Sequence, residues 1–247
     1  MRDDGIQVNY IVPSDVFLQV GMELFRGSRF PSAGEHDEAG AWTAFANVGG
    51  DVGIAHSWLL GLSHWRADSV DGRSSGGGHS HDGEEAEIPS FMGESKINAI
   101  DLVYKWAPRG NAKQTNFKLQ FEYFDRKEEG LIKMINSHPL EFTRYNGNQR
   151  GWYTQGVYQL VPQWRVGLRY DQLQSDNTGS DEEVLEEAEM GNVSHRPKRY
   201  SLMGEWVPSE FSRIRLQFNR DHSYENTSNQ VFLQYSYSLG SHGSHSF

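Results

Sequence analysis

Apolar and polar side chains alternate along the C-terminal stretch 229–247. Val231 and Leu233 fall on one face of an extended chain and Gln234 on the other, and the chain ends on the aromatic Phe247. Successive side chains of a strand point to opposite faces, so this pattern predicts a strand that is apolar on one side and wet on the other. Many β proteins contain such a strand, so the class of β protein has to be inferred from the rest of the chain.

Ten further stretches show a similar alternation, which predicts an all-β fold of about eleven strands. One segment, 182–190, could form a turn or two of helix. The predicted strands are 5–12, 16–24, 42–48, 58–65, 100–106, 117–123, 152–160, 165–171, 200–206, 213–219 and 229–247.

Short turns and long polar loops alternate between these strands. The long loops are expected at about 27–41, 68–95, 125–147 and 175–196. A soluble sandwich has no reason to place a long loop at every second connection, whereas outer-membrane barrels combine short periplasmic turns with long external loops. The pattern therefore predicts an antiparallel up-and-down transmembrane β-barrel, with residues 1–247 in a single barrel domain.

The tryptophans fit two aromatic belts at the membrane interfaces. One group adjoins short turns and the other adjoins long loops; the groups are Trp106, Trp164 and Trp206, and Trp42, Trp65 and Trp152.

Composition is compatible with a barrel and narrows the possible functions. Mean hydropathy is −0.68, and no run approaches the roughly 18 apolar residues of a membrane-spanning helix. The chain has no cysteine, which excludes disulfides and thiolate sites, and its net charge of −10 argues against binding nucleic acid. No motif joins a nucleophile to an oriented base, so the sequence predicts no enzyme.

The direction of the strands suggests that others precede them. If the short turns are periplasmic, the last strand runs inward and Met1 lies outside the cell, although the N-terminus of a barrel comes from the periplasm. Eleven is also an odd number for a bacterial barrel, and an open edge is not viable in lipid. We therefore expect the chain to be the C-terminal part of a larger barrel.

Charged residues occupy the wet face of the predicted strands. In a pore they would set selectivity through their field; alternatively, they pair across strands and only fill the interior. The candidate pore-lining residues are Glu23, Asp101, Lys105, Lys118, Glu122, Arg165, Arg169, Asp171, Arg199, Glu205, Arg213 and Arg215.

A Gly-rich loop carries the candidate metal ligands His79, His81, Asp82 and Glu84. Two imidazoles with carboxylates suit Zn²⁺, and a loop of this kind would bind it weakly. The alternative is a solvated polar loop without a metal. No cofactor is required in either case.

Four stretches, Asp101–Asn111, Gln155–Tyr170, Ser209–Gln217 and Ser238–Phe247, resemble porin-like proteins often labelled zinc-regulated TonB-dependent outer-membrane receptors. Typical members have Ala in place of Ser241 and Ser244, and they are longer at the N-terminus. The resemblance implies a location in the bacterial outer membrane, contact with its lipid, and insertion by the barrel-assembly machinery through the strand ending in Phe247. It also raises a TonB-type energy transducer as a partner.

These observations predict a porin-like channel for small solutes, including metal ions or metal complexes. One alternative is a TonB-dependent zinc or metal receptor whose plug precedes this chain. A second is a barrel that transports nothing and binds partners through its surface loops.

Overall fold

The computed structural model describes residues 3–34, 39–74, 87–192, 195–209 and 211–239. Its eleven strands form one antiparallel sheet in which spatial order follows sequence order. The predicted all-β fold of eleven strands is therefore confirmed. The strands are β1 (Gly5–Ile11), β2 (Phe17–Phe25), β3 (Ala41–Val52), β4 (His56–Ser74), β5 (Ile88–Trp106), β6 (Asn116–Ile135), β7 (Glu141–Val161), β8 (Trp164–Gly179), β9 (Lys198–Ser209), β10 (Ser212–Asp221) and β11 (Ser228–Tyr237).

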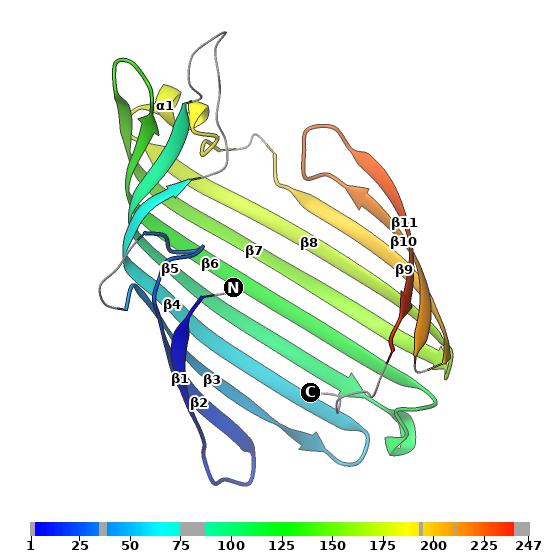
Figure 1. Cartoon of the computed structure of the whole chain (residues 1–247). Helices are drawn as coiled ribbons and strands as arrows, with labels where there is room; N and C mark the ends of the chain where they lie inside the picture. Colours follow the sequence, from blue (N-terminus) through cyan, green and yellow to red (C-terminus); the bar gives the residue numbers. More distant parts are fainter. Residues whose placement is uncertain (1–2, 35–38, 75–86, 193–194, 210, 240–247) are drawn as a thin grey trace.

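The sheet bends across its width, so that β1–β3 and β9–β11 flank β4–β8 (Figure 1). It thus has a concave face and a convex face. Within the residues that the structure describes, β1 pairs only with β2 and β11 only with β10, so these two strands are the edges of the sheet.

Successive connections lie at opposite ends of the strands. The end with the connections 12–16, 53–55, 107–115, 162–163 and 210–211 is called the turn end. The other, called the loop end, has the connections 26–40, 75–87, 136–140, 180–197 and 222–227. A 3₁₀ turn, Pro108–Gly110, lies at the turn end, and the helix α1 (Glu182–Glu187) lies at the loop end, inside the segment where a short helix was expected. Neither of these described helices is long or apolar enough to cross a membrane.

Two of the expected loops are much shorter than predicted. Strands occupy large parts of 68–95 and 125–147, because β4 continues to Ser74, β5 begins at Ile88, β6 continues to Ile135 and β7 begins at Glu141. The register of β6 with β7 is unbroken from Asn116↔Gln159 to Met134↔Glu141. Backbone pairing therefore persists beyond the point where charged residues appear among the outward side chains. The polarity of this stretch led to the prediction of a loop.

The outer part of β4 does not show period-two alternation, because its pairing with β5 is irregular. The register between β4 and β5 shifts between Ala67 and Val70 and again between Val70 and Arg73. Bulges of this kind re-aim side chains. As a result, residues three positions apart all face the concave side and are buried, with exposures of 1%, 2% and 8% for Ala67, Val70 and Arg73.

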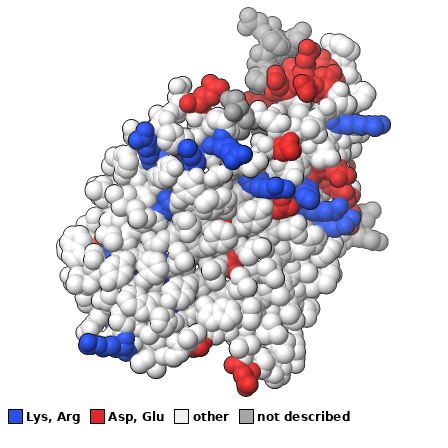
Figure 2. Space-filling view, turned by 180° about the vertical axis from the view of Figure 1, so that it is seen from behind, with Lys and Arg blue, Asp and Glu red and all other residues white. Residues whose placement is uncertain are grey.

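The convex face is a broad apolar band. Large side chains stay exposed there, such as Leu168 at 66%, Leu216 at 55% and Leu233 at 75%. Figure 2 shows this face from behind: uncharged residues fill its middle, and the charged side chains gather mostly toward the loop end. On β7 the band runs from Trp152 to Leu160, close to the roughly 9–11 residues that a tilted strand needs to cross a bilayer.

Aromatic side chains border this band on both sides. Toward the loop end, the ring centroids of Trp152 and Tyr170 are 5.1 Å apart and those of Tyr170 and Tyr200 are 4.9 Å apart. Toward the turn end, Trp164 and Trp206 stack at 6.2 Å. The assignment of Trp65 to a belt is wrong: it lies two residues before Ala67 on β4, so it also faces the concave side, where it is only 5% exposed.

Candidate functional site: the concave wall

Strand register places all twelve predicted charged residues on the concave face. One row across the sheet pairs Asp101 with Glu122, Glu122 with Tyr153, Tyr153 with Asp171 and Asp171 with Arg199. Residues that are an even number of positions apart on one strand, or that pair directly across two strands, point to the same face. The remaining predicted residues are related to this row in one of these two ways. The alternation read from the sequence is the reason for this common face.

Glu205 is the centre of the densest charge cluster. The register sets Arg165 and Arg215 directly opposite it on β8 and β10. Glu205 is only 2% exposed, and its oxygens lie 3.2 Å from Nη1 of Arg165, 2.7 Å from Nη2 of Arg215 and 4.0 Å from Nη1 of Arg213. A buried carboxylate costs desolvation unless cations compensate it, and here three guanidinium groups share one carboxylate.

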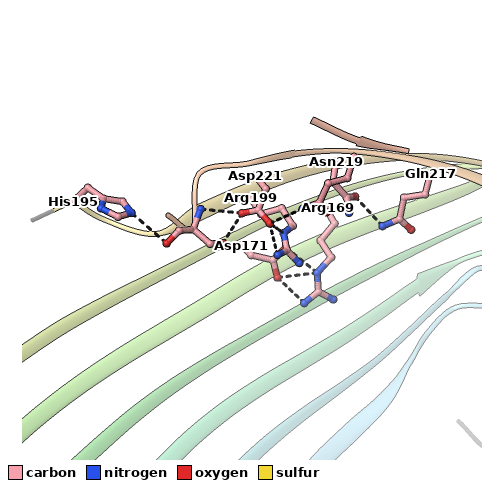
Figure 3. Close-up of polar contacts among 9 residues, drawn as sticks. Arg169, Asp171, His195, Arg199, Gln217, Asn219 and Asp221 are labelled. Atoms are coloured by element: carbon pink, nitrogen blue, oxygen red, sulfur yellow. Dashed lines mark hydrogen bonds and ion pairs between the residues drawn. The ribbon is translucent and has the colours of Figure 1, made fainter. Parts of the chain in front are cut away.

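Two further ion pairs lie on β8–β10 toward the loop end (Figure 3). Arg169 Nη2 contacts Asp171 Oδ1 at 2.6 Å, and its guanidinium lies 3.7 Å from the centre of the Tyr153 ring. Arg199 donates from Nε to Asp221 Oδ2 at 2.9 Å. Asp221, 4% exposed, was not predicted because it ends its strand next to a loop. These contacts hold long side chains against the wall in fixed positions.

The predicted residues do not form a single site. Asp101 and Glu122 are direct cross-strand neighbours of like charge, and so are Lys105 and Lys118. The two pairs are four residues apart along β5 and β6, or about 13 Å at the usual rise of a strand. Glu23 lies apart from them, on β2. The wall is therefore divided into acidic and basic zones.

The half of the wall around Glu23 is more apolar than the sequence suggested. A cavity of about 910 Å³ opens there, and aromatic side chains such as Phe45, Trp65 and Phe124 line it together with Glu23 and Arg126. These aromatic residues have the same alternating positions as the charged ones and face the same side. They were not predicted as wall residues, because only polar side chains were expected there.

A dry core covers the concave face at the loop end. Strand residues including Phe91, Ile132 and Met134, each at most 1% exposed, pack together with Val184 and Leu185 of α1. Asn177 on β8 secures this connection, donating from Nδ2 to the Met190 carbonyl at 2.9 Å. Residues 180–192 of this connection therefore fold inward over the wall.

Residues 26–34 of the connection 26–40 also fold onto this core. Arg73 Nη1 donates to the Pro31 carbonyl at 2.7 Å, and the Arg73 guanidinium lies 5.8 Å from the centre of the Phe30 ring. At the base of the connection, Gly27 has a φ of 81°, and a Cβ there would lie 2.7 Å from the Gly40 Cα. Glycine permits both this conformation and this close approach.

Buried ions join the inward-folded connection to the sheet. Glu128, 1% exposed, contacts Arg73 Nη1 at 2.7 Å and Arg126 Nη2 at 2.9 Å, and it accepts a hydrogen bond from Ser95 at 2.8 Å. The outward neighbours Lys127 and Glu129 show that this level lies beyond the apolar band. Burial raises the pKa of the Glu128 carboxyl, but the hydrogen bonds and charges of its partners outweigh burial and hold that pKa below its usual value.

The predicted metal ligands His79, His81, Asp82 and Glu84 lie outside the described residues. In the part of the chain that the structure describes, no group of three or more His, Asp or Glu side chains is arranged to hold a metal ion. The zinc site stays a prediction.

Comparisons with known proteins show what this chain is similar to. No protein-family model matches it. An uncharacterized protein of Aquifex aeolicus is 26% identical over 263 residues, covering 99% of this chain and 51% of that protein. Among solved structures, in-vitro folded OmpT, an outer membrane protein of Vibrio cholerae, superposes with a TM-score of 0.50 at 12% identity, covering 87% of this chain and 53% of that one. A second structure, outer-membrane expressed OmpT of Vibrio cholerae, gives a TM-score of 0.43 at 8% identity over 88% of this chain and 77% of that one.

In fold, this chain is therefore an antiparallel meander of eleven strands that resembles part of a porin-type barrel. The chain spans about half the length of the curated relative that it matches. The zinc-regulated receptor label suggested by the sequence stays a prediction, because the structural likeness is one of fold.

Proposed function

We propose that this chain forms part of the wall of an outer-membrane channel through which small solutes pass. The observation that carries the proposal is the difference between the two faces of the same strands. Between the aromatic borders, the convex face of the described strands has no Lys, Arg, Asp or Glu, whereas the concave face has ion-paired charges throughout β8–β10. Lipid on one side and water on the other account for this difference.

The membrane location belongs to the same proposal. The apolar convex face would contact outer-membrane lipid, and the barrel-assembly machinery would recognise the C-terminal sequence that ends in Phe247. The two edge strands, β1 and β11, need hydrogen-bonding partners within lipid. Further strands, supplied by the same protein or by a second copy, would close the barrel.

Conductance measurements test this function. The protein, produced with its whole sequence, should give stepwise current in a planar lipid bilayer without an energy source. The chain lacks cysteine, so single cysteines can be placed cleanly: Ser201→Cys on the concave wall and Thr154→Cys on the convex face. A bulky, charged thiol reagent should reduce the current through the Ser201 variant and leave the Thr154 variant unchanged.

The other two readings predict different results. A TonB-dependent receptor would stay closed until its energy transducer acts, and a surface-binding barrel would conduct in neither variant. Metal transport, or a weakly bound zinc ion at His79 and His81, adds a separate expectation. Calorimetric titration with Zn²⁺ should then give weaker binding for a His79→Ala, His81→Ala double variant, and equal affinity would remove these residues as ligands.

A further inference from the structure

The wall formed by β6–β10 has an excess of positive charge. A cavity of about 340 Å³ opens on the concave face there. Its charged lining consists of one carboxylate, Glu205, and five cations, which are Lys118, Arg165, Arg169, Arg213 and Arg215. The amides of Asn116, Gln155 and Gln217 and the hydroxyl of Ser201 line the same cavity.

The carboxylates on this wall offset only part of that charge. Arg215 directs both Nε and Nη2 to Glu205 Oε2, at 3.0 and 2.7 Å, and Arg169 is paired with Asp171. Arg165 divides its donors between Glu205 Oε1 at 3.2 Å and Gln159 Oε1 at 3.0 Å. Arg213 approaches Glu205 no closer than 4.0 Å, which is beyond hydrogen-bond reach. Three guanidinium groups around one carboxylate leave a surplus of positive charge.

The geometry suits anions that present several oxygens. A guanidinium offers parallel N–H groups that match carboxylate and phosphate oxygens, whereas an ammonium acts as a point charge. Arg213 is 44% exposed toward the cavity, and Arg165 is 39% exposed. Lys118 has Lys105 as its direct cross-strand neighbour, which extends the positive zone along the wall.

We propose that this basic cavity makes the channel prefer anions and binds small oxyanions, phosphates or carboxylates, weakly as they pass. The inference rests on the proposed channel function. It predicts that chloride permeates the protein faster than potassium in a salt gradient. It also predicts that inorganic phosphate, added at millimolar concentration, reduces the chloride current by occupying the cavity.

Matched variants on β10 test the assignment. Arg213→Gln removes a cation from the concave wall, whereas Arg220→Gln removes one from the opposite face of the same strand. The first should lower the chloride-to-potassium permeability ratio roughly two- to threefold, as expected for one charge a few ångströms from the path, and should weaken the block by phosphate. The second should change neither quantity. Arg213→Glu should lower the ratio further than Arg213→Gln does.

Lys118→Gln and Lys127→Gln provide a second matched pair, on opposite faces of β6. Here too, only the concave-face variant should alter selectivity. A wild-type channel that prefers potassium, or equal ratios in both members of each pair, would overturn the inference while leaving the channel function intact. A protein that never conducts would instead overturn the proposed function, and the anion preference with it.

Discussion

Glu128→Gln isolates the buried ions that hold the connection 26–40 against the wall. The substitution keeps the shape of the side chain and removes its charge. Arg73, 8% exposed, and Arg126, 22% exposed, then lose their shared carboxylate. Breaking a buried ion pair from one side costs about 3–5 kcal/mol, because it leaves an uncompensated buried charge. We expect the free energy of unfolding to fall by about that amount.

The matched control is Glu94→Gln on the neighbouring strand. Glu94, 30% exposed, pairs with Lys96 at 2.9 Å and with Arg66 at 3.4 Å. A solvated pair of this kind contributes about 0–1 kcal/mol. Urea unfolding of both variants in lipid vesicles, followed by tryptophan fluorescence, measures the difference. If Glu128→Gln loses no more stability than Glu94→Gln, the buried cluster does not hold the loop end together.

The same cluster predicts a pH dependence. The partners of Glu128 hold its pKa below the ordinary value of 4.5. A carboxyl with a lowered folded pKa stabilises the fold fully above its unfolded pKa, and this contribution disappears as the pH falls through the folded pKa. Wild type should therefore lose this stability below about pH 4.5. The Glu128→Gln variant should lack that part of the acid loss, and parallel pH profiles for the two proteins would contradict the assignment.

Two further predictions concern the membrane. Leu216→Arg on the convex face should destabilise the protein in lipid by about 2–4 kcal/mol if the site lies near the bilayer midplane, whereas the adjacent Gln217→Arg on the concave face should cost much less; equal losses would mean that the faces are misassigned. In intact cells, a cysteine at Tyr224, 81% exposed at the loop end, should react with an impermeant thiol reagent. A cysteine at Ile54, 82% exposed at the turn end, should react only after the outer membrane is permeabilised, and the reverse pattern would contradict the proposed orientation.

Side-chain parity was predictable within the apolar band, because lipid and water impose opposite demands on the two faces. Leu216 and Gln217 show this on β10, where adjacent residues pair with Leu233 and Phe232 on opposite faces. The cross-strand contacts of the charged residues were harder to predict from the sequence. That Glu205 collects three arginines depends on the register of β8, β9 and β10, which no single strand encodes.

The loop end could not be predicted from the same rule, because the alternation breaks down there. Along β6, Phe121 and Tyr123 point outward within the band while Glu122 points inward. Beyond Asp125 this division breaks down: Lys127 and Lys133 point outward together with Leu131 and Ile135, while Ile132 and Met134, both fully buried, point inward. In the proposed channel, the strand has left the lipid at that level, so its convex face is in water and its concave face carries the inward-folded connections. In the proposed channel, this change marks the membrane boundary and the level at which the described residues of the connections 26–40 and 180–197 cover the wall. A solute that enters such a channel from the loop end meets this core before it reaches the arginines around Glu205.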